Sequence, residues 1–212
     1  MRLSVCCIAL AALAFVSPTA YGAEWVSLFN GKNLEGWQAI DGPMSSWHVE
    51  DGILFCSGGG GGWLSTTKEY GDFEIEVEFR VPPGGNSGVF LRAPHQGNPA
   101  FAGMEVQVLD DRAPEYAKLE PYQYCGSLYG IAAPNTRVSK PAGEWQQLHI
   151  RCQGRQVKVT LNDTVISDTN LDEQKQHEAT HPGITRATGY VGLQNHGTRL
   201  DYRNVRLREL KP

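Results

Sequence analysis

The chain has 212 residues, enough for one β-sandwich domain, and its 24 glycines, 12 prolines and five tryptophans are typical of a loop-rich β protein. Its 19 Lys and Arg residues against 23 Asp and Glu residues give a net charge of −4, with no basic cluster. This balance argues against nucleic acid or a membrane surface as a partner, because both would select for clustered positive charge.

The N-terminus is predicted to be a signal peptide covering residues 1–22. Arg2 supplies a basic start, residues 5–16 form an apolar run, and Ala20-Tyr21-Gly22 offers small residues where a signal peptidase cleaves. The run is too short for a membrane anchor, although a tethered N-terminus is the alternative. We therefore expect an exported protein, periplasmic or secreted, with a single domain over residues 23–212.

The clearest strand covers residues 73–81, where apolar residues alternate with Glu74, Glu76, Glu78 and Arg80. This period of two predicts one buried and one wet face. Similar short runs recur along the chain, at residues 26–29, 47–49, 53–56, 63–65, 87–92, 104–109, 127–129, 147–152, 156–161, 164–167, 189–194 and 201–209. About a dozen short strands in one domain predict two stacked antiparallel sheets, a sandwich or jelly roll.

Two polar segments, residues 115–120 and 171–178, are the only ones expected to be helical. The glycine run 58–62 is expected to be a flexible loop and not a phosphate cradle, because no Lys-Ser/Thr and helix follow it. We see no repeat and no second domain.

Three cysteines, Cys56, Cys125 and Cys152, follow the predicted leader. An odd number allows at most one disulfide, and their spacing is not that of a zinc site. The other reading is that all three are small buried hydrophobic residues.

The predicted strand 104–109 carries a candidate site. Because side chains alternate, its apolar residues share one face, and Glu105 and Gln107 share the other. A β-bulge at Leu109–Asp110 would bring the Asp110 carboxylate to the same face, since bulges are common beside active sites. In the alternative reading, Glu105 is a solvated strand residue and Asp110 a turn residue.

The order Glu-x-Gln-x-x-Asp resembles the Glu-x-Asp-x-x-Glu of jelly-roll β-glucanases. Here an amide replaces the middle acid, which disfavours double-displacement hydrolysis, since that reaction needs paired carboxylates.

Neighbouring strands add further polar groups to this face. Alternation puts Arg92 opposite the apolar residues of strand 87–92, and it puts Gln194 and His196 opposite those of strand 189–194. A histidine can act as base, acid or metal ligand near neutral pH. Arg92, Asn86 and Gln194 are donors suited to sugar hydroxyls or a carbonyl, and Trp63, Phe90, Tyr124 and Tyr129 are aromatic residues that could stack on a pyranose ring.

Seven segments occur in order between residues 25 and 210: SLFNGKNLEGW, WHVEDGIL, TKEYGDFEIEVEFRVPPGGNSGVFLR, GMEVQVLDD, GSLYG, KPAGEWQQLHIRCQGRQVKVTLND and GYVGLQNHGTRLDYRNVRLREL. Together they closely resemble the 3-keto-disaccharide hydrolase domain family. The resemblance implies an all-β, concanavalin A-like jelly-roll sandwich of the lectin and glucanase type. It also implies an exported bacterial enzyme that cleaves glycosides already oxidised at C3 of the sugar, as a lyase or with later addition of water.

The positions that match the family are Asn86, Arg92, Glu105, Gln107, Asp110, Gln194 and His196. The resemblance implies that all seven belong to the site, without a fixed role for each. A C3 ketone acidifies the C2 proton, so a base can form an enolate, and β-elimination can then break the C1–oxygen bond.

The site hypothesis assigns catalysis and binding separately. The catalytic residues would be Glu105 or His196 as the base and Asp110 at the leaving group. The substrate-binding residues would be Arg92, Gln107, Gln194, Asn86, Tyr129 and Trp63. No cofactor is certain, but a divalent cation held by Glu105, Gln107, Asp110 or His196 is compatible with these residue types.

Three functions compete at this stage: a 3-keto-glycoside-cleaving enzyme, a non-catalytic lectin-like glycan-binding module, and an ordinary glycoside hydrolase. In each case the partner is a small carbohydrate. The fold alone does not choose among them.

Overall fold

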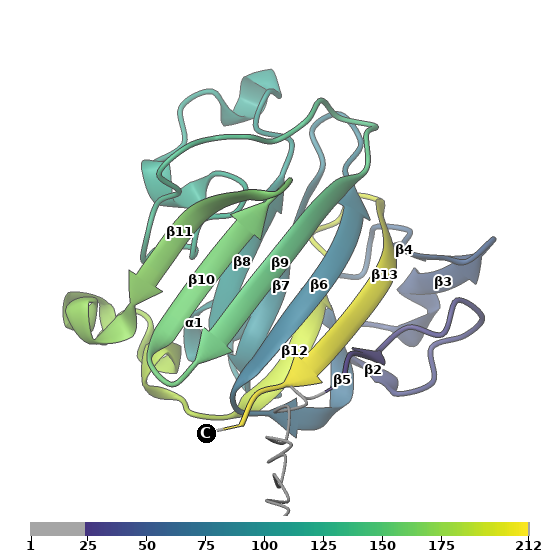
Figure 1. Ribbon diagram of the computed structural model, residues 1–212. Coiled ribbons are helices and arrows are strands. Elements are labelled where there is room, and N and C mark those ends of the chain that lie inside the picture. Colours follow the sequence, from purple (N-terminus) through teal and green to yellow (C-terminus); the bar gives the residue numbers. More distant parts are fainter. Residues whose placement is uncertain (1–23, 212) are drawn as a thin grey trace, which may run out of the picture.

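The computed structural model describes residues 24–211, so the predicted signal peptide lies outside the described residues. Two antiparallel sheets pack face to face (Figure 1). Sheet A has the order β11-β10-β9-β6-β13-β4-β3, with β1 also paired to β13, and sheet B has the order β2-β5-β12-β7-β8. The prediction of an all-β sandwich is confirmed.

The strands of sheet A are β1 (Val26–Ser27), β3 (Trp47–Glu50), β4 (Ile53–Cys56), β6 (Phe73–Arg80), β9 (Gln146–Gln153), β10 (Gln156–Leu161), β11 (Thr164–Asn170) and β13 (Leu200–Glu209). The strands of sheet B are β2 (Trp37–Ile40), β5 (Trp63–Tyr70), β7 (Asn86–Ala93), β8 (Met104–Leu109) and β12 (Gly189–Gln194).

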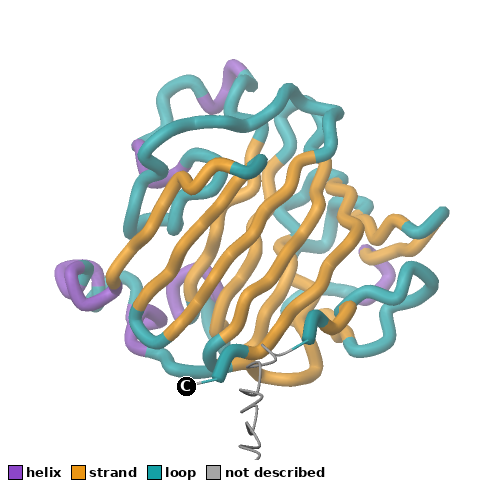
Figure 2. The backbone as a smooth tube through the Cα atoms, in the orientation of Figure 1, coloured by secondary structure: helices purple, strands orange, loops and turns teal. Residues whose placement is uncertain are grey.

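Helical turns lie at the margins of the sheets, as Figure 2 shows. They are α1 (Pro99–Ala102) and the 3-10 turns η1 (Met44–Ser46), η2 (Pro114–Tyr116), η3 (Pro121–Gln123), η4 (Leu171–Glu173), η5 (Lys175–His177) and η6 (Pro182–Thr185). The two segments expected to be helical therefore form only short turns. Among the described residues no helix is long and apolar enough to cross a membrane.

The core lies between the sheets and follows the alternation of the sequence. On β6, Phe73, Ile75, Val77 and Phe79 are at most 1% exposed and belong to the main apolar cluster. Cys56, Cys125 and Cys152 belong to the same cluster, all three as free thiols. Of the two readings of these cysteines, the structure supports small buried hydrophobic residues.

Arg92 near the end of β7 ties the two layers together and does not reach the outer face of sheet B. Its φ of 48° breaks the alternation of the strand. The guanidinium donates to the carbonyl oxygens of Gly71 (3.0 Å), Gly154 (2.9 Å) and Arg186 (3.3 Å), and to Asp72 Oδ1 (3.0 Å). With 1% of its surface exposed, Arg92 is a structural cross-link, and its predicted place in the substrate site is wrong.

We predict that Arg92→Lys lowers the free energy of unfolding by about 2–4 kcal/mol, because an ammonium cannot reach four acceptors that lie around a planar guanidinium. Urea unfolding measures the change. The matched control is Arg80→Lys. The Arg80 side chain pairs with Asp201 and is 34% exposed, so this substitution should lower the free energy of unfolding by no more than about 1 kcal/mol. Equal losses in the two variants would contradict the cross-link.

Candidate active site

The outer face of sheet B carries two rows of side chains that cross all five strands. The strand registers align one row as Gln38, Ser65, Gly192, Phe90 and Glu105. The second row contains Ile40, Trp63 and Gln194 on β2, β5 and β12, and Gly88 and Gln107 on β7 and β8. The face predicted for Glu105, Gln107, Gln194 and Trp63 is therefore one continuous surface.

Two glycines in these rows make room for larger neighbours. A Cβ at Gly88 would lie 1.9 Å from Glu105 Oε1, and a Cβ at Gly192 would lie 2.2 Å from the indole of Trp63. The Glu105 carboxyl therefore lies over β7, and the Trp63 ring lies over β12. Both side chains therefore lean from β8 and β5 toward the central strand β12, which carries Gln194.

Glu105 is 3% exposed, and no arginine or lysine pairs with it among the residues that the structure describes. Removal from water disfavours the charged carboxylate, so burial raises the pKa of Glu105 from 4.5 to about 8. A carboxyl with a pKa raised by burial, on a strand face with other polar groups, is a candidate acid–base group.

Gln107 and Asn86 lie beside this carboxyl. In the orientation that satisfies its neighbours, the Gln107 amide nitrogen donates to Glu105 Oε1 (3.2 Å) and to the Ser87 carbonyl oxygen (2.9 Å). In this orientation the Gln107 amide oxygen faces Asn86 Oδ1 at 3.5 Å, so the two amides are neighbours without a hydrogen bond between them. Gln107 therefore holds Glu105 in place, and Asn86 adds a second amide next to it.

A hollow of about 280 Å³ opens further along the second row. Its lining residues are Asp41, Gly62, Trp63, Phe90, Gly97, Asn98, Pro99, Gln194 and Asn195. Two buried polar atoms of this lining, Trp63 Nε1 and Gln194 Oε1, have no hydrogen-bond partner in the structure. Buried polar atoms without partners are rare, so a group that binds here could satisfy both.

Several residues near this hollow escaped sequence analysis. Asn195 donates to the carbonyl oxygens of Gly59 (2.6 Å) and Gly61 (3.1 Å), which fixes the glycine run that was expected to be a flexible loop. His95 stacks on Tyr190, with ring centroids 3.7 Å apart. Both His95 and Asn195 lie outside the strands, where no periodic signal could identify them.

Asp110 does not join Glu105, and the proposed role at the leaving group is wrong. The register between β7 and β8 runs without a shift through Leu109, so the expected bulge is absent. Asp110 instead accepts backbone N–H bonds from Gly84 (3.0 Å) and Arg112 (3.2 Å). It is the turn residue of the alternative reading.

The remaining predicted residues are more peripheral. His196 lies beyond the end of β12 and is exposed. Tyr129 is half-buried, and its backbone N–H donates to the Glu105 carbonyl oxygen (2.9 Å). Glu105, Arg92 and His196 therefore do not share one cavity. Within residues 24–211 no group of three or more His, Cys, Asp or Glu residues could hold a metal ion.

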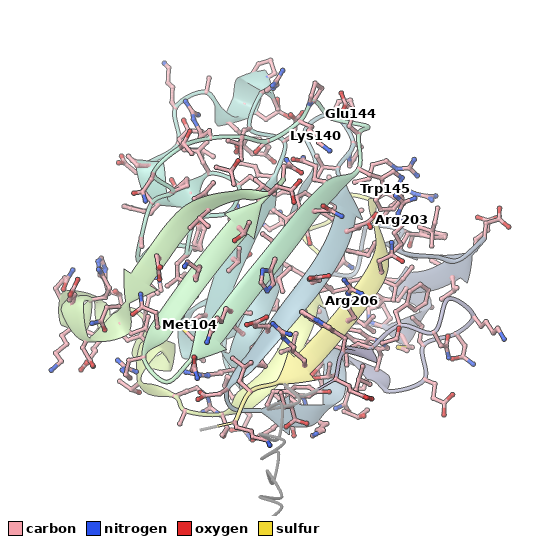
Figure 3. The ribbon with its side chains drawn as sticks, in the orientation of Figure 1. Met104, Lys140, Glu144, Trp145, Arg203 and Arg206 are labelled. Carbon is pink, nitrogen blue, oxygen red and sulfur yellow. The ribbon has the colours of Figure 1, made fainter. Side chains whose placement is uncertain are left out.

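A larger hollow, about 730 Å³, lies on the outer face of sheet A, the face toward the viewer in Figure 3. Two of its three lining carboxylates are neutralised by β13: Arg206 pairs with Glu76 (2.5 Å), and Arg203 pairs with Glu78 (2.7 Å). Within the part of the chain that the structure describes, the unpartnered buried side-chain atoms lining either hollow are those of Trp63 and Gln194. We therefore place the candidate site on sheet B despite the smaller volume.

The fold and its relatives define a carbohydrate-active enzyme built on a concanavalin A-like jelly roll. A non-specific endo-β-1,3(4)-glucanase of family GH16 shares this fold, with a TM-score of 0.57 at 13% identity over 90% of this chain and 91% of that one. The chain belongs to the 3-keto-alpha-glucoside-1,2-lyase-like domain family, whose model matches residues 24–208. The family resemblance of the sequence is thus confirmed.

Two other proteins are more similar to this chain in sequence. A 3-keto-disaccharide hydrolase of Bacteroides thetaiotaomicron is 28% identical over 227 residues, covering 88% of this chain and 78% of the relative. The crystal structure of a candidate glycosyl hydrolase from Parabacteroides distasonis has a TM-score of 0.78 at 27% identity. The aligned region covers 88% of this chain and 94% of the Parabacteroides distasonis chain.

We predict that Glu105→Gln has a higher free energy of unfolding than the wild type, and that the difference grows as pH rises. Between pH 4.5 and about 8 the folded carboxyl keeps a proton that the unfolded chain has lost, so the wild type loses stability across that window. The neutral amide has no such loss. Urea unfolding at pH 5, 6, 7 and 8 should show a difference that widens to a few kcal/mol.

Glu144→Gln is the control for this series, because Glu144 is exposed. Its difference from the wild type should stay small at every pH. A Glu105→Gln difference that is constant from pH 5 to pH 8 would show that burial does not shift the Glu105 pKa.

Proposed function

We propose that this protein cleaves glycosides oxidised at C3 by β-elimination, with the buried Glu105 carboxyl as its acid–base group. The observation that carries the proposal is one isolated, desolvated carboxyl on a polar sheet face. The family description names a lyase and the relative is named a hydrolase, and both names fit a reaction that begins with the same elimination.

Ordinary glycosidases need two carboxylates about 5–9.5 Å apart. Two other carboxylates of this surface are Glu69 on β5, which pairs across the sheet with Tyr190, and Asp41, which follows Ile40 on β2 at the opposite edge of sheet B from Glu105. Three inter-strand steps of about 4.8 Å separate β5 from β8, or roughly 14 Å. Four inter-strand steps of about 4.8 Å separate β2 from β8, or roughly 19 Å. The proposal therefore uses a reaction in which one carboxyl is sufficient.

In this reaction Glu105, as carboxylate, takes the proton from C2, and the C2–H electron pair forms an enolate with its charge on O3. That electron pair then forms the C1=C2 double bond while the C1–oxygen bond breaks. The leaving oxygen takes back the proton from Glu105, so atoms and charge balance. Water added across the C1=C2 bond gives the 3-keto sugar and net hydrolysis.

Two amides support these steps. Gln107 donates to Glu105 Oε1 and so orients the carboxyl during both proton transfers. The Asn86 amide lies next to Gln107 on the same face and is the donor assigned to the developing charge on O3. Arg92 is not available for this role, because its guanidinium bonds to Gly71, Gly154, Arg186 and Asp72 inside the fold. A positioned donor stabilises an oxyanion without reorganising at the moment of reaction.

The assay offers 3-keto-trehalose and trehalose to the pure protein and follows sugar release. Cleavage of only the oxidised sugar is the expected result, and Glu105→Gln should lower its kcat about 10²–10⁴-fold. Asp110→Asn is the matched control and should stay within a few-fold of the wild type, because its partners are backbone N–H groups. Cleavage of trehalose itself would favour an ordinary hydrolase, and binding without turnover a lectin-like module.

The pH dependence provides a second test. Because the carboxylate is the reactive form, kcat/KM for the oxidised sugar should rise by up to about tenfold per pH unit and level off near the Glu105 pKa of about 8. Initial rates from pH 5.5 to pH 9 measure the profile. The residual activity of Glu105→Gln should not show this rise, and a flat wild-type profile would remove Glu105 as the base.

Export to the periplasm or medium is part of the proposal, on the basis of the leader-like residues 1–22. N-terminal sequencing of the mature protein tests it. Cleavage close to Gly22 is expected.

A further inference from the structure

The outer face of sheet B is covered at a place where a sheet face is usually open to solvent. Trp63 and Phe90 belong to the outward rows of β5 and β7, yet each is only 1% exposed. With Ala93 and Ala100 they form a small buried cluster that is separate from the main core. Ala100 belongs to α1, so the cover is the connection between β7 and β8, residues 94–103, which we call the strap.

One hydrogen bond joins the strap to the rest of the chain. The backbone bonds of its helical turn all stay inside residues 94–103. Among residues 24–211, the bond that leaves the strap is between His95 Nε2 and Ser65 Oγ (3.0 Å). Ser65 donates its own proton to the Thr66 carbonyl oxygen (2.8 Å), so His95 is the donor.

The other contacts of the strap are between rings. His95 stacks on Tyr190 with centroids 3.7 Å apart, and Phe101 meets His181 edge to face at 4.9 Å. A segment with one external hydrogen bond and a small apolar cluster opens locally at a lower free energy than the whole domain unfolds.

The neighbouring cover of the site is fixed, in contrast to the strap. The segment after η3 runs beside β8 and bonds to it: the Gln107 N–H donates to the Ser127 carbonyl oxygen (3.0 Å), and the Tyr129 N–H donates to that of Glu105 (2.9 Å). Leu128 between them is fully buried in the main core. This segment cannot move without disrupting sheet B, so the strap is the cover that can open.

Opening would change the surface beside the buried carboxyl. Residues 97–99 of the strap line the hollow together with Trp63 and Gln194, whose Nε1 and Oε1 atoms are buried without partners. Water that enters on opening can bond to both atoms, which lowers the cost of the open state. Phe90 under the strap pairs directly with Glu105, which is 3% exposed, so opening uncovers the side of the site next to this carboxyl.

We infer that the strap is a gate over the candidate site, closed in this structure and held by the bond from His95 to Ser65. It opens by breaking that bond and the stack on Tyr190, and the substrate reaches Glu105 through the open state. The link to Glu105 rests on the proposed function, whereas the opening itself does not.

Thiol labelling tests the opening. Ala100→Cys places a thiol on the covered side of the strap, and the native Cys56, Cys125 and Cys152 of the main core are internal controls. Iodoacetamide should modify the introduced thiol at least about 100-fold faster than the native three, because these become accessible only on global unfolding. Equal rates for all four thiols would overturn the gate.

Hydrogen exchange without the introduced thiol tests the latch. Ser65→Ala removes the acceptor of His95, and peptides that cover the strap should exchange about 3–10-fold faster, while those of β6 keep their rates. The matched control is Tyr190→Phe, which keeps the ring under His95 and should change the rates less than twofold. Unchanged exchange of the strap in Ser65→Ala would overturn the latch.

Activity separates the gate from the proposed function. Ser65→Ala should raise kcat/KM for 3-keto-trehalose by the same factor as the exchange, because the fraction of protein that can bind the sugar rises. Faster opening with an unchanged kcat/KM would overturn the strap as the route to Glu105. If the wild type cleaves no oxidised sugar, the proposed function fails, and labelling and exchange still decide whether the strap opens.

Discussion

The site depends on one constraint, the register that sets Gly88 of β7 opposite Gln107 of β8. In that register the Glu105 carboxyl lies over a residue without a side chain and is enclosed instead of solvated. A slip of one residue would turn Glu105 into the core, because side chains alternate between faces. The raised pKa, the bond from Gln107 and the proposed chemistry all follow from this pairing.

Alternation in the sequence was sufficient to predict this face but not its limits. It identified the buried side of β6 and the shared face of Glu105 and Gln107, since both strands are regular throughout. It failed for Arg92, because a positive φ reverses the direction of one side chain without leaving a signature in the pattern. For Asp110 the expected bulge is absent, and a motif shared with glucanases could not reveal that.

The hollow could not have been predicted from any single segment. Its lining comes from the end of β2, the start of β5, the loop before α1 and the end of β12, which meet only in the folded chain. Asn195 illustrates the difficulty, since its importance comes from bonds to Gly59 and Gly61, more than 130 residues earlier. In the sequence, asparagine and glycine at these positions are typical of any loop.

The two outer faces of the sandwich treat polar groups in opposite ways, and this contrast argues for function on sheet B. On sheet A, Glu74, Glu76 and Glu78 each pair with an arginine of β13, so every carboxylate of β6 has a cation beside it. On sheet B a carboxyl is buried without a cation, and a donor and an acceptor are buried without partners. Such groups cost stability in the free protein, and under the proposed function the bound sugar offsets that cost.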